Sequence, residues 1–341
     1  GMKNFTLQLL LLSIFLLGTS LLFGAYVTYQ PITLQQPDGS VLNLFASGDE
    51  FYNWVHDKDG YTIMRDSKGW YVYAMQMGKD IAPSPFVVGR DNPAIRGIQP
   101  QVNKSPDTIG QIRKLRYQQM ISHGEGRAPH SGTLNNIVIF IRFSDQSEFT
   151  DPITTYSSMF NGMSGNTMQN YFSEASYGQL NISTTFYPAP STTVLSYQDS
   201  HPRAYYSPYD ATTNPDGYTS SNSTSREHTL LVNAVNGVSS GIPSTLTVDA
   251  DGDGKVDNVC FIIQGNSDGW AELLWPHRWS LYSQYAYING KRVYDYNFQL
   301  SLFMASRGVG VLCHEMFHSL GAPDLYHYTT QPVSPVGSWD I

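Results

Sequence analysis

The segment of residues 313–326 (CHEMFHSLGAPDLY) constrains the chain more than any other stretch of its sequence. His314 and His318 are four residues apart, so on a helix their imidazoles project from the same face, about one turn apart, and can share one metal ion. Glu315 lies beside the first histidine. Its carboxylate can take a proton from a zinc-activated water and later return it to a leaving group. The spacing therefore predicts a zinc site on a helix, with Glu315 as general base.

The third zinc ligand is expected just after this helix. Gly321 allows the helix to stop and the chain to turn sharply, which brings Asp324 back toward the ion. His327 is close enough in sequence to compete, but the distance of Asp324 from the glycine matches the spacing HExxHxxGxxD, so we expect Asp324 to be the ligand. Tyr326 is a candidate cleft residue that stabilises an oxyanion, and a packing role is the alternative.

An export signal is expected at the start of the chain. Lys3 is the only charge before an apolar run over residues 7–25, and small residues close that run. This order is typical of a cleavable secretory signal, here residues 1–25. An uncleaved anchor is the alternative, because the run approaches the length that spans a bilayer. We expect the product to be secreted, periplasmic or on the cell surface, and to contact the membrane only through this signal.

The rest of the chain divides into three segments by pattern. Residues 26–90 show short apolar or alternating runs separated by turn signals, which indicates a small β-rich unit. Residues 91–132 contain prolines, a basic helical stretch and a flexible, protease-accessible end, as expected of a linker or activation segment. Residues 133–341 mix strand and helix patterns without strict alternation, which favours an α+β fold.

Composition excludes several classes of protein. A chain of 341 residues with 41% hydrophobic residues can bury a sizeable core, so wholesale disorder is excluded. Its 20 Lys and Arg against 28 Asp and Glu give a net charge of −8, which argues against nucleic acid as the main partner. Two cysteines cannot form a disulfide scaffold. Cys260 and Cys313 are either bonded to each other or separately buried as thiols.

A second metal site is predicted in an acidic loop. Four carboxylates occupy loop positions 1, 3, 5 and 9, with a glycine at position 6; they are Asp249, Asp251, Asp253 and Asp257. The pattern is typical of an EF-hand calcium loop. Position 12 is Cys260, however, where an EF-hand needs a bidentate Glu, and a strand pattern follows where a helix is needed. We therefore expect a structural calcium loop of another kind, and a solvated Asp/Gly turn is the alternative.

Several segments together resemble one known family, the M6 family of secreted zinc metallopeptidases of the immune inhibitor A type, within the metzincin-like zincins. In the C-terminal half the resemblance rests on HEMFHSLGAPDLY, WPHRW, VIFIRFSD and YFSEASYGQL, at residues 314–326, 275–279, 138–145 and 171–180. In the N-terminal unit QPDG, GDEFYNWV and DGYTI resemble the propeptide region of that family, at residues 36–39, 48–55 and 59–63.

This resemblance implies a fold and a site. The fold is a zincin-like catalytic domain, with a twisted mixed sheet and an active-site helix, preceded by a small β-rich prodomain. The resemblance also implies zinc ligation by His314, His318 and Asp324, with Glu315 as general base. Such enzymes usually carry a methionine-containing turn shortly after the third ligand. No methionine follows Met316 in this chain, so we expect the catalytic domain to be cut short at its C-terminus.

The expected function is that of a secreted zinc endopeptidase that hydrolyses peptide bonds in proteins and is made as a zymogen. The N-terminal segment would fold over the cleft and be released by a cut near Arg127. His277 and Trp279 are candidate cleft residues, although tryptophan-rich segments are more often core. Two alternatives are a surface binding protein that holds zinc without catalysis, and a zinc hydrolase that acts on glycoprotein or cell-wall linkages.

Overall fold

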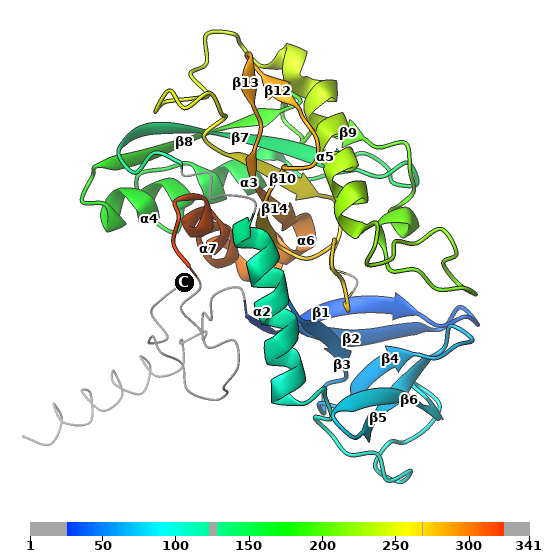
Figure 1. Ribbon diagram of the computed structural model, residues 1–341. Helices are drawn as coiled ribbons and strands as arrows, with labels where there is room; N and C mark the ends of the chain where they lie inside the picture. Colours follow the sequence, from blue (N-terminus) through cyan, green and yellow to red (C-terminus); the bar gives the residue numbers. More distant parts are fainter. Residues whose placement is uncertain (1–25, 123–127, 268, 324–341) are drawn as a thin grey trace, which may run out of the picture.

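The computed structural model describes residues 26–122, 128–267 and 269–323 (Figure 1). Several predictions lie outside these residues: the export signal of residues 1–25, the cut near Arg127, and the roles of Asp324, Tyr326 and His327. No helix in the described part of the chain is long and apolar enough to cross a membrane. The described chain combines sheets with a few helices, so the prediction of a mixed α and β structure is confirmed at that coarse level.

The N-terminal unit, residues 26–122, is built on a six-stranded antiparallel sheet whose strands pair in sequence order. Its strands are β1 (Val27–Gln35), β2 (Val41–Gly48), β3 (Asn53–His56), β4 (Thr62–Arg65), β5 (Tyr71–Met77) and β6 (Asp80–Val87). Gly39, Gly60 and Gly69 have φ of +86°, +83° and +83° at the turns between successive strands. Residues with a side chain rarely adopt that conformation, which is why these turn signals are readable in the sequence.

The C-terminal unit, residues 128–323, is built on a mixed sheet with the strand order β11-β14-β10-β7-β8, and β9 also pairs with β7. The strands are β7 (Gly132–Arg142), β8 (Leu180–Tyr187), β9 (Tyr197–Gln198), β10 (Val259–Ile263), β11 (His277–Ser280) and β14 (Asp295–Leu300). All the pairs are parallel except that β11 runs antiparallel to β14 at one edge. A two-stranded hairpin, β12 (Tyr287–Ile288) and β13 (Lys291–Arg292), lies between β11 and β14 in sequence.

Helices cover both faces of this sheet, which explains the unbroken apolar run in β7. Ile137, Ile139 and Ile141 pack in one cluster with residues of α5, whereas Val138 and Phe140 pack in a second cluster with residues of α4 and α7. The helices are α3 (Ile153–Phe160), α4 (Met168–Ala175), α5 (Ser223–Val238), α6 (Ser301–Arg307) and α7 (Val309–Ser319). Short 3-10 turns occupy Arg203–Tyr206 and Ser239–Gly241.

The two units share one hydrophobic core. Ile32, Val55 and Ile63 of the N-terminal sheet belong to the same buried cluster as Ile139 and Phe261 of the C-terminal sheet. The long helix α2 (Pro106–Ser122) leaves the first sheet and lies between it and the C-terminal unit (Figure 1). The segment predicted as a linker therefore contributes a helix to the interface between the units.

Direct contacts also join the units across long sequence separations. The Asn53 side chain donates to the Ala271 carbonyl at 2.8 Å and accepts from the Ala271 amide at 2.8 Å, 218 residues away. Trp270 donates through its indole nitrogen to the Ile63 carbonyl at 2.9 Å. Within the N-terminal unit, Arg113 of α2 forms a buried ion pair with Asp49 at 2.5 Å. These contacts fix α2 to its own sheet and the sheet to residues 270–271.

Replacing Arg113 with Ala should destabilise the chain by about 3–5 kcal/mol, because Asp49 stays buried without its guanidinium partner. The free energy of unfolding from urea titration measures the effect. Arg96→Ala is the matched control, since it breaks an ion pair with Asp91 in which the arginine is half exposed, and it should cost about 1 kcal/mol or less. Equal costs for the two variants would contradict the prediction.

Candidate active site

Helix α7 brings the two predicted histidine ligands together. The Nε2 atoms of His314 and His318 are 3.0 Å apart, and the ring planes are nearly perpendicular at 85°. Both side chains are buried. Two imidazole nitrogens that converge in this way can bind the same metal ion, as the four-residue spacing on a helix predicts.

The end of α7 fixes the orientation of one ring. Gly321 has φ of +91°, and its amide donates to the His318 carbonyl at 3.0 Å. The turn that follows places the Ala322 carbonyl where it accepts a hydrogen bond from His318 Nδ1 at 2.8 Å. Because that proton resides on Nδ1, the lone pair of His318 lies on Nε2, which is the atom that faces His314. The turn at Gly321, which the sequence predicts, therefore also fixes the tautomer of His318.

Glu315 is fully buried on α7, on the side of the sheet. Burial raises the pKa of the Cys260 thiol on β10, and the charge of Glu315 raises it further. The same charge also acts on His277 of β11. A donor set of two imidazoles beside a carboxylate fits zinc. A third protein ligand must come from another part of the chain, and the two candidates, Asp324 and His327, lie outside the described residues.

A network of buried amides holds α7 against the sheet. Ser319, the residue after His318, donates to Asn258 at 2.8 Å and accepts from Asn297 at 3.1 Å. Asn258 in turn accepts from Asn297 at 2.9 Å and donates to Asn136 at 2.6 Å. All four side chains are buried. These residues were not identified from sequence, although asparagines beside apolar strand runs are a readable signal.

The candidate cleft residue His277 forms a buried pair with Glu227 of α5. His277 donates through Nδ1 to the Trp275 carbonyl at 2.7 Å and through Nε2 to Glu227 at 3.1 Å. Both partners are acceptors, so the ring carries both protons as an imidazolium. Burial alone would lower the pKa of His277, but the charge and hydrogen bond of Glu227 outweigh it and raise the pKa. Glu227, which also accepts from the Tyr296 hydroxyl, was not identified from sequence.

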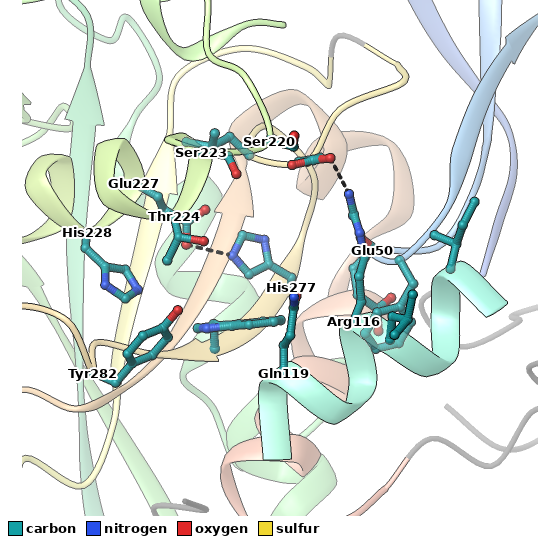
Figure 2. A pocket seen from close by; sticks show the side chains of 16 residues that line it. Glu50, Arg116, Gln119, Ser220, Ser223, Thr224, Glu227, His228, His277 and Tyr282 are labelled. Carbon is teal, nitrogen blue, oxygen red and sulfur yellow. Dashed lines mark hydrogen bonds and ion pairs between the residues drawn. The ribbon is translucent and has the colours of Figure 1, made fainter. Parts of the chain in front are cut away.

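This pair lies in the wall of a cavity of about 450 Å³ between α2, α5 and β11. Figure 2 shows Glu227 and His277 facing each other there, with Arg116 and Gln119 of α2 on the near side. Trp279, the second candidate cleft residue, lines the same cavity. The structure therefore places two of the three candidate cleft residues in one cavity, which the N-terminal unit covers, and the third, Tyr326, lies outside the described residues.

The described end of the linker contacts α7, the helix that carries the two candidate zinc ligands. The Ala128 amide donates to the Ser319 carbonyl at 3.0 Å, and His130 donates through Nε2 to the Leu320 carbonyl at 2.8 Å. These carbonyls belong to the last turn of α7, immediately after His318. Residues 128–130 therefore run against the helix end that orients one of the candidate zinc ligands.

Three of the four aspartates in the acidic loop form a cluster. Carboxylate oxygens of Asp249, Asp251 and Asp257 lie within 4.8 Å of one another and can hold a metal ion. Asp253 instead pairs with Lys255 at 3.1 Å, and Asp249 also binds Lys291 of β13 at 2.6 Å. Burial, followed by the charges of the other three aspartates, raises the pKa of Asp257 to about 7.

The two cysteines are separate buried thiols in the structure. Cys260 lies on β10 and Cys313 on α7, and both belong to the cluster on the α7 side of the sheet. Burial raises the pKa of Cys313 to about 12. Neither thiol is thus activated as a thiolate near neutral pH.

The comparisons with known proteins show structural likeness only at a distant level. No protein-family model and no curated protein matches the chain. Among solved structures, metalloproteinase-II from Bacteroides fragilis is similar at a TM-score of 0.26 and 12% identity, over 89% of this chain and 80% of that one. A likeness at this level establishes neither a shared fold nor a shared function, so the case for a function depends on the residues themselves.

Replacing Asn258 with Ala should destabilise the chain by at least about 2 kcal/mol, because buried groups of Asn136, Asn297 and Ser319 each lose a partner. It should also weaken zinc binding by about 10-fold or more, because the last turn of α7 is no longer fixed. Urea titration and competition with a zinc chelator measure the two effects. The control is Asn135→Ala, because Asn135 is next to Asn136 in sequence but is half-buried and donates to the Thr247 carbonyl outside the network. A variant at Asn258 that behaves like this control would argue against a positioning role.

Calcium should stabilise the chain more at pH 8 than at pH 5. The pKa of Asp257 is about 7 in the folded chain, well above the ordinary value of 3.8 for an aspartate. Without a cation, its contribution to stability is therefore present below about pH 4 and is lost as the pH rises to about 7. A divalent cation relieves the repulsion that appears at high pH. Melting temperatures of chelator-treated protein, with and without calcium at both pH values, measure this. Asp257→Asn should reduce the difference, whereas no calcium response at pH 8 would refute the site.

Proposed function

We propose that the chain is an exported zinc endopeptidase of the M6 type with a zincin fold, made as an inactive precursor. One observation carries the proposal: the 3.0 Å convergence of His314 and His318 Nε2 on a buried helix that also holds Glu315. A purely structural zinc site normally has four closed protein ligands and needs no adjacent base. The carboxylate beside the first ligand therefore favours hydrolysis over a structural role.

His314, His318 and Asp324 would hold the zinc ion in this proposal. Bound zinc supplies Lewis acidity, which polarises a carbonyl oxygen and lowers the pKa of water. Glu315 takes the proton from the attacking water and returns it to the leaving amine. The Ala322 carbonyl keeps the His318 proton on Nδ1, so that Nε2 is available for binding.

The edge of the sheet supports a peptide as the substrate. β11 is the antiparallel edge strand, and in the described part of the chain no strand pairs with its outer side. An extended peptide can add to such an edge through main-chain hydrogen bonds. The same edge is adjacent to β14, against which Ser319 of α7 is held through Asn297. A peptide bound along β11 would therefore pass close to α7 and its two histidines.

The contacts between the units support a precursor. Helix α2 covers the cavity beside β11, and residues 128–130 run against the end of α7. In the proposal, residues 26–130 block the cleft until the linker is cut near Arg127. The apolar run of residues 7–25 would direct export, and protein substrates would be met outside the cytoplasm. The aspartate cluster of Asp249, Asp251 and Asp257 would bind calcium and stabilise the loop before β10.

Glu315→Gln should lower the rate of casein digestion by at least about 10²-fold while zinc stays bound, because the amide cannot accept the proton from water. The full chain, cut in the linker by limited proteolysis, is assayed for digestion and for zinc by elemental analysis. His318→Ala is the comparison variant and should lose both zinc and activity. Full digestion by Glu315→Gln would disprove the general-base role, and digestion that survives a chelator in the unaltered chain would disprove the proposed function.

A further inference from the structure

The two walls of the cavity beside β11 come from different units of the chain. One wall belongs to α2 of the N-terminal unit and includes Leu115, Arg116 and Gln119. The other belongs to the C-terminal unit and includes Glu272 together with Glu227 and His277; the last two are labelled in Figure 2. When α2 is removed, the C-terminal wall is left as an open hollow beside the edge strand. The chemistry of this wall determines which side chain of a peptide fits there.

Glu272 supplies the acidic group of this wall. Its Oε1 pairs with Arg116 Nη2 at 2.6 Å, and Arg116 is the only Lys or Arg among the described residues that line the cavity. The two side chains are 33% and 26% exposed, so the pair is only partly solvated. The Glu272 amide donates to the buried Tyr218 hydroxyl at 2.6 Å. Glu272 is thus anchored by its own unit, independently of α2.

The other charges of the wall compensate each other. Glu227 is neutralised by the imidazolium of His277, to which it is hydrogen bonded at 3.1 Å. His228, the second histidine of the wall, is hydrogen bonded through Nδ1 to Ser283 Oγ at 2.5 Å. Loss of Arg116 therefore leaves Glu272 as the carboxylate that needs a new cationic partner.

The rest of the wall suits a long side chain with an apolar stem. Leu273, Trp279 and Tyr282 line the cavity. Aliphatic stems of arginine and lysine pack on such surfaces while the charged head reaches an acid, and aromatic faces also attract a guanidinium. The hollow thus combines one anchored carboxylate with apolar and aromatic walls.

We propose that this hollow is a specificity pocket that takes an arginine or lysine side chain of the substrate peptide, with Glu272 as the residue that selects it. In the precursor Arg116 occupies the place of that side chain, so α2 blocks the pocket with the group that the pocket binds. The inference depends on the proposed function, because it names the class of peptide on which that activity works.

The test compares peptides in which one arginine is replaced by citrulline, which has nearly the same shape and no charge. With the full chain cut in the linker, we expect the arginine peptide to have a kcat/KM about 10-fold or more above its citrulline partner at one peptide position. In Glu272→Gln this ratio should fall to about 1. Glu174→Gln, an exposed carboxylate on α4, is the matched control and should keep the ratio.

A binding measurement separates this inference from the proposed function. Fluorescence anisotropy of the same labelled peptides with the cut Glu315→Gln chain needs no turnover, and it should show the arginine preference and its loss on adding Glu272→Gln. The uncut chain should show no preference, because Arg116 fills the pocket. Hydrolysis or binding without an arginine preference, or a preference that Glu272→Gln leaves unchanged, overturns the inference. Binding with the preference but no hydrolysis by any form overturns the proposed function and keeps the pocket.

Discussion

The hydrogen bonds of Asn258 are the constraint on which the candidate site depends. Asn258 is hydrogen bonded to Asn136 on β7, to Asn297 on β14 and to Ser319 at the end of α7. A buried polar network that is largely satisfied has few alternative arrangements, because each shift leaves a polar group without a partner in a low-dielectric interior. The position of the end of α7 against the sheet, and with it the place of His318, follows from this network.

The local parts of the site could be predicted from the sequence. The helical spacing of His314 and His318 and the helix end at Gly321 depend on residues within about ten positions of one another, so spacing and backbone preference suffice. The turns at Gly39, Gly60 and Gly69 are readable for the same reason. The antiparallel direction of β11 is not readable, because it depends on how residues far apart in the chain pair with each other.

The parts that the sequence could not predict are contacts between distant segments. Glu227 lies within a helix pattern, and nothing near it in sequence indicates the histidine 50 residues later with which it pairs. Arg116 lies in the basic helical stretch that the sequence indicates, and nothing near it in sequence identifies Glu272, with which the fold pairs it. Residues 91–132 show proline and glycine signals that indicate a linker, yet α2 is held by the buried pair of Arg113 and Asp49. In each case tertiary packing gives the residue its role, and local pattern does not.

The hydrophobic core that spans both units affects the order in which the units fold and the way in which they can separate. Ile32 and Val55 are synthesised long before Ile139 and Phe261, against whose cluster they pack. The first sheet pairs its strands in sequence order, so it can fold early. The later segment can then pack against its apolar face. Breaking one peptide bond between the units removes a covalent tether and leaves this shared apolar surface buried. Separation of the two pieces after such a cut would therefore be a second step, with a rate that depends on the cost of exposing that surface.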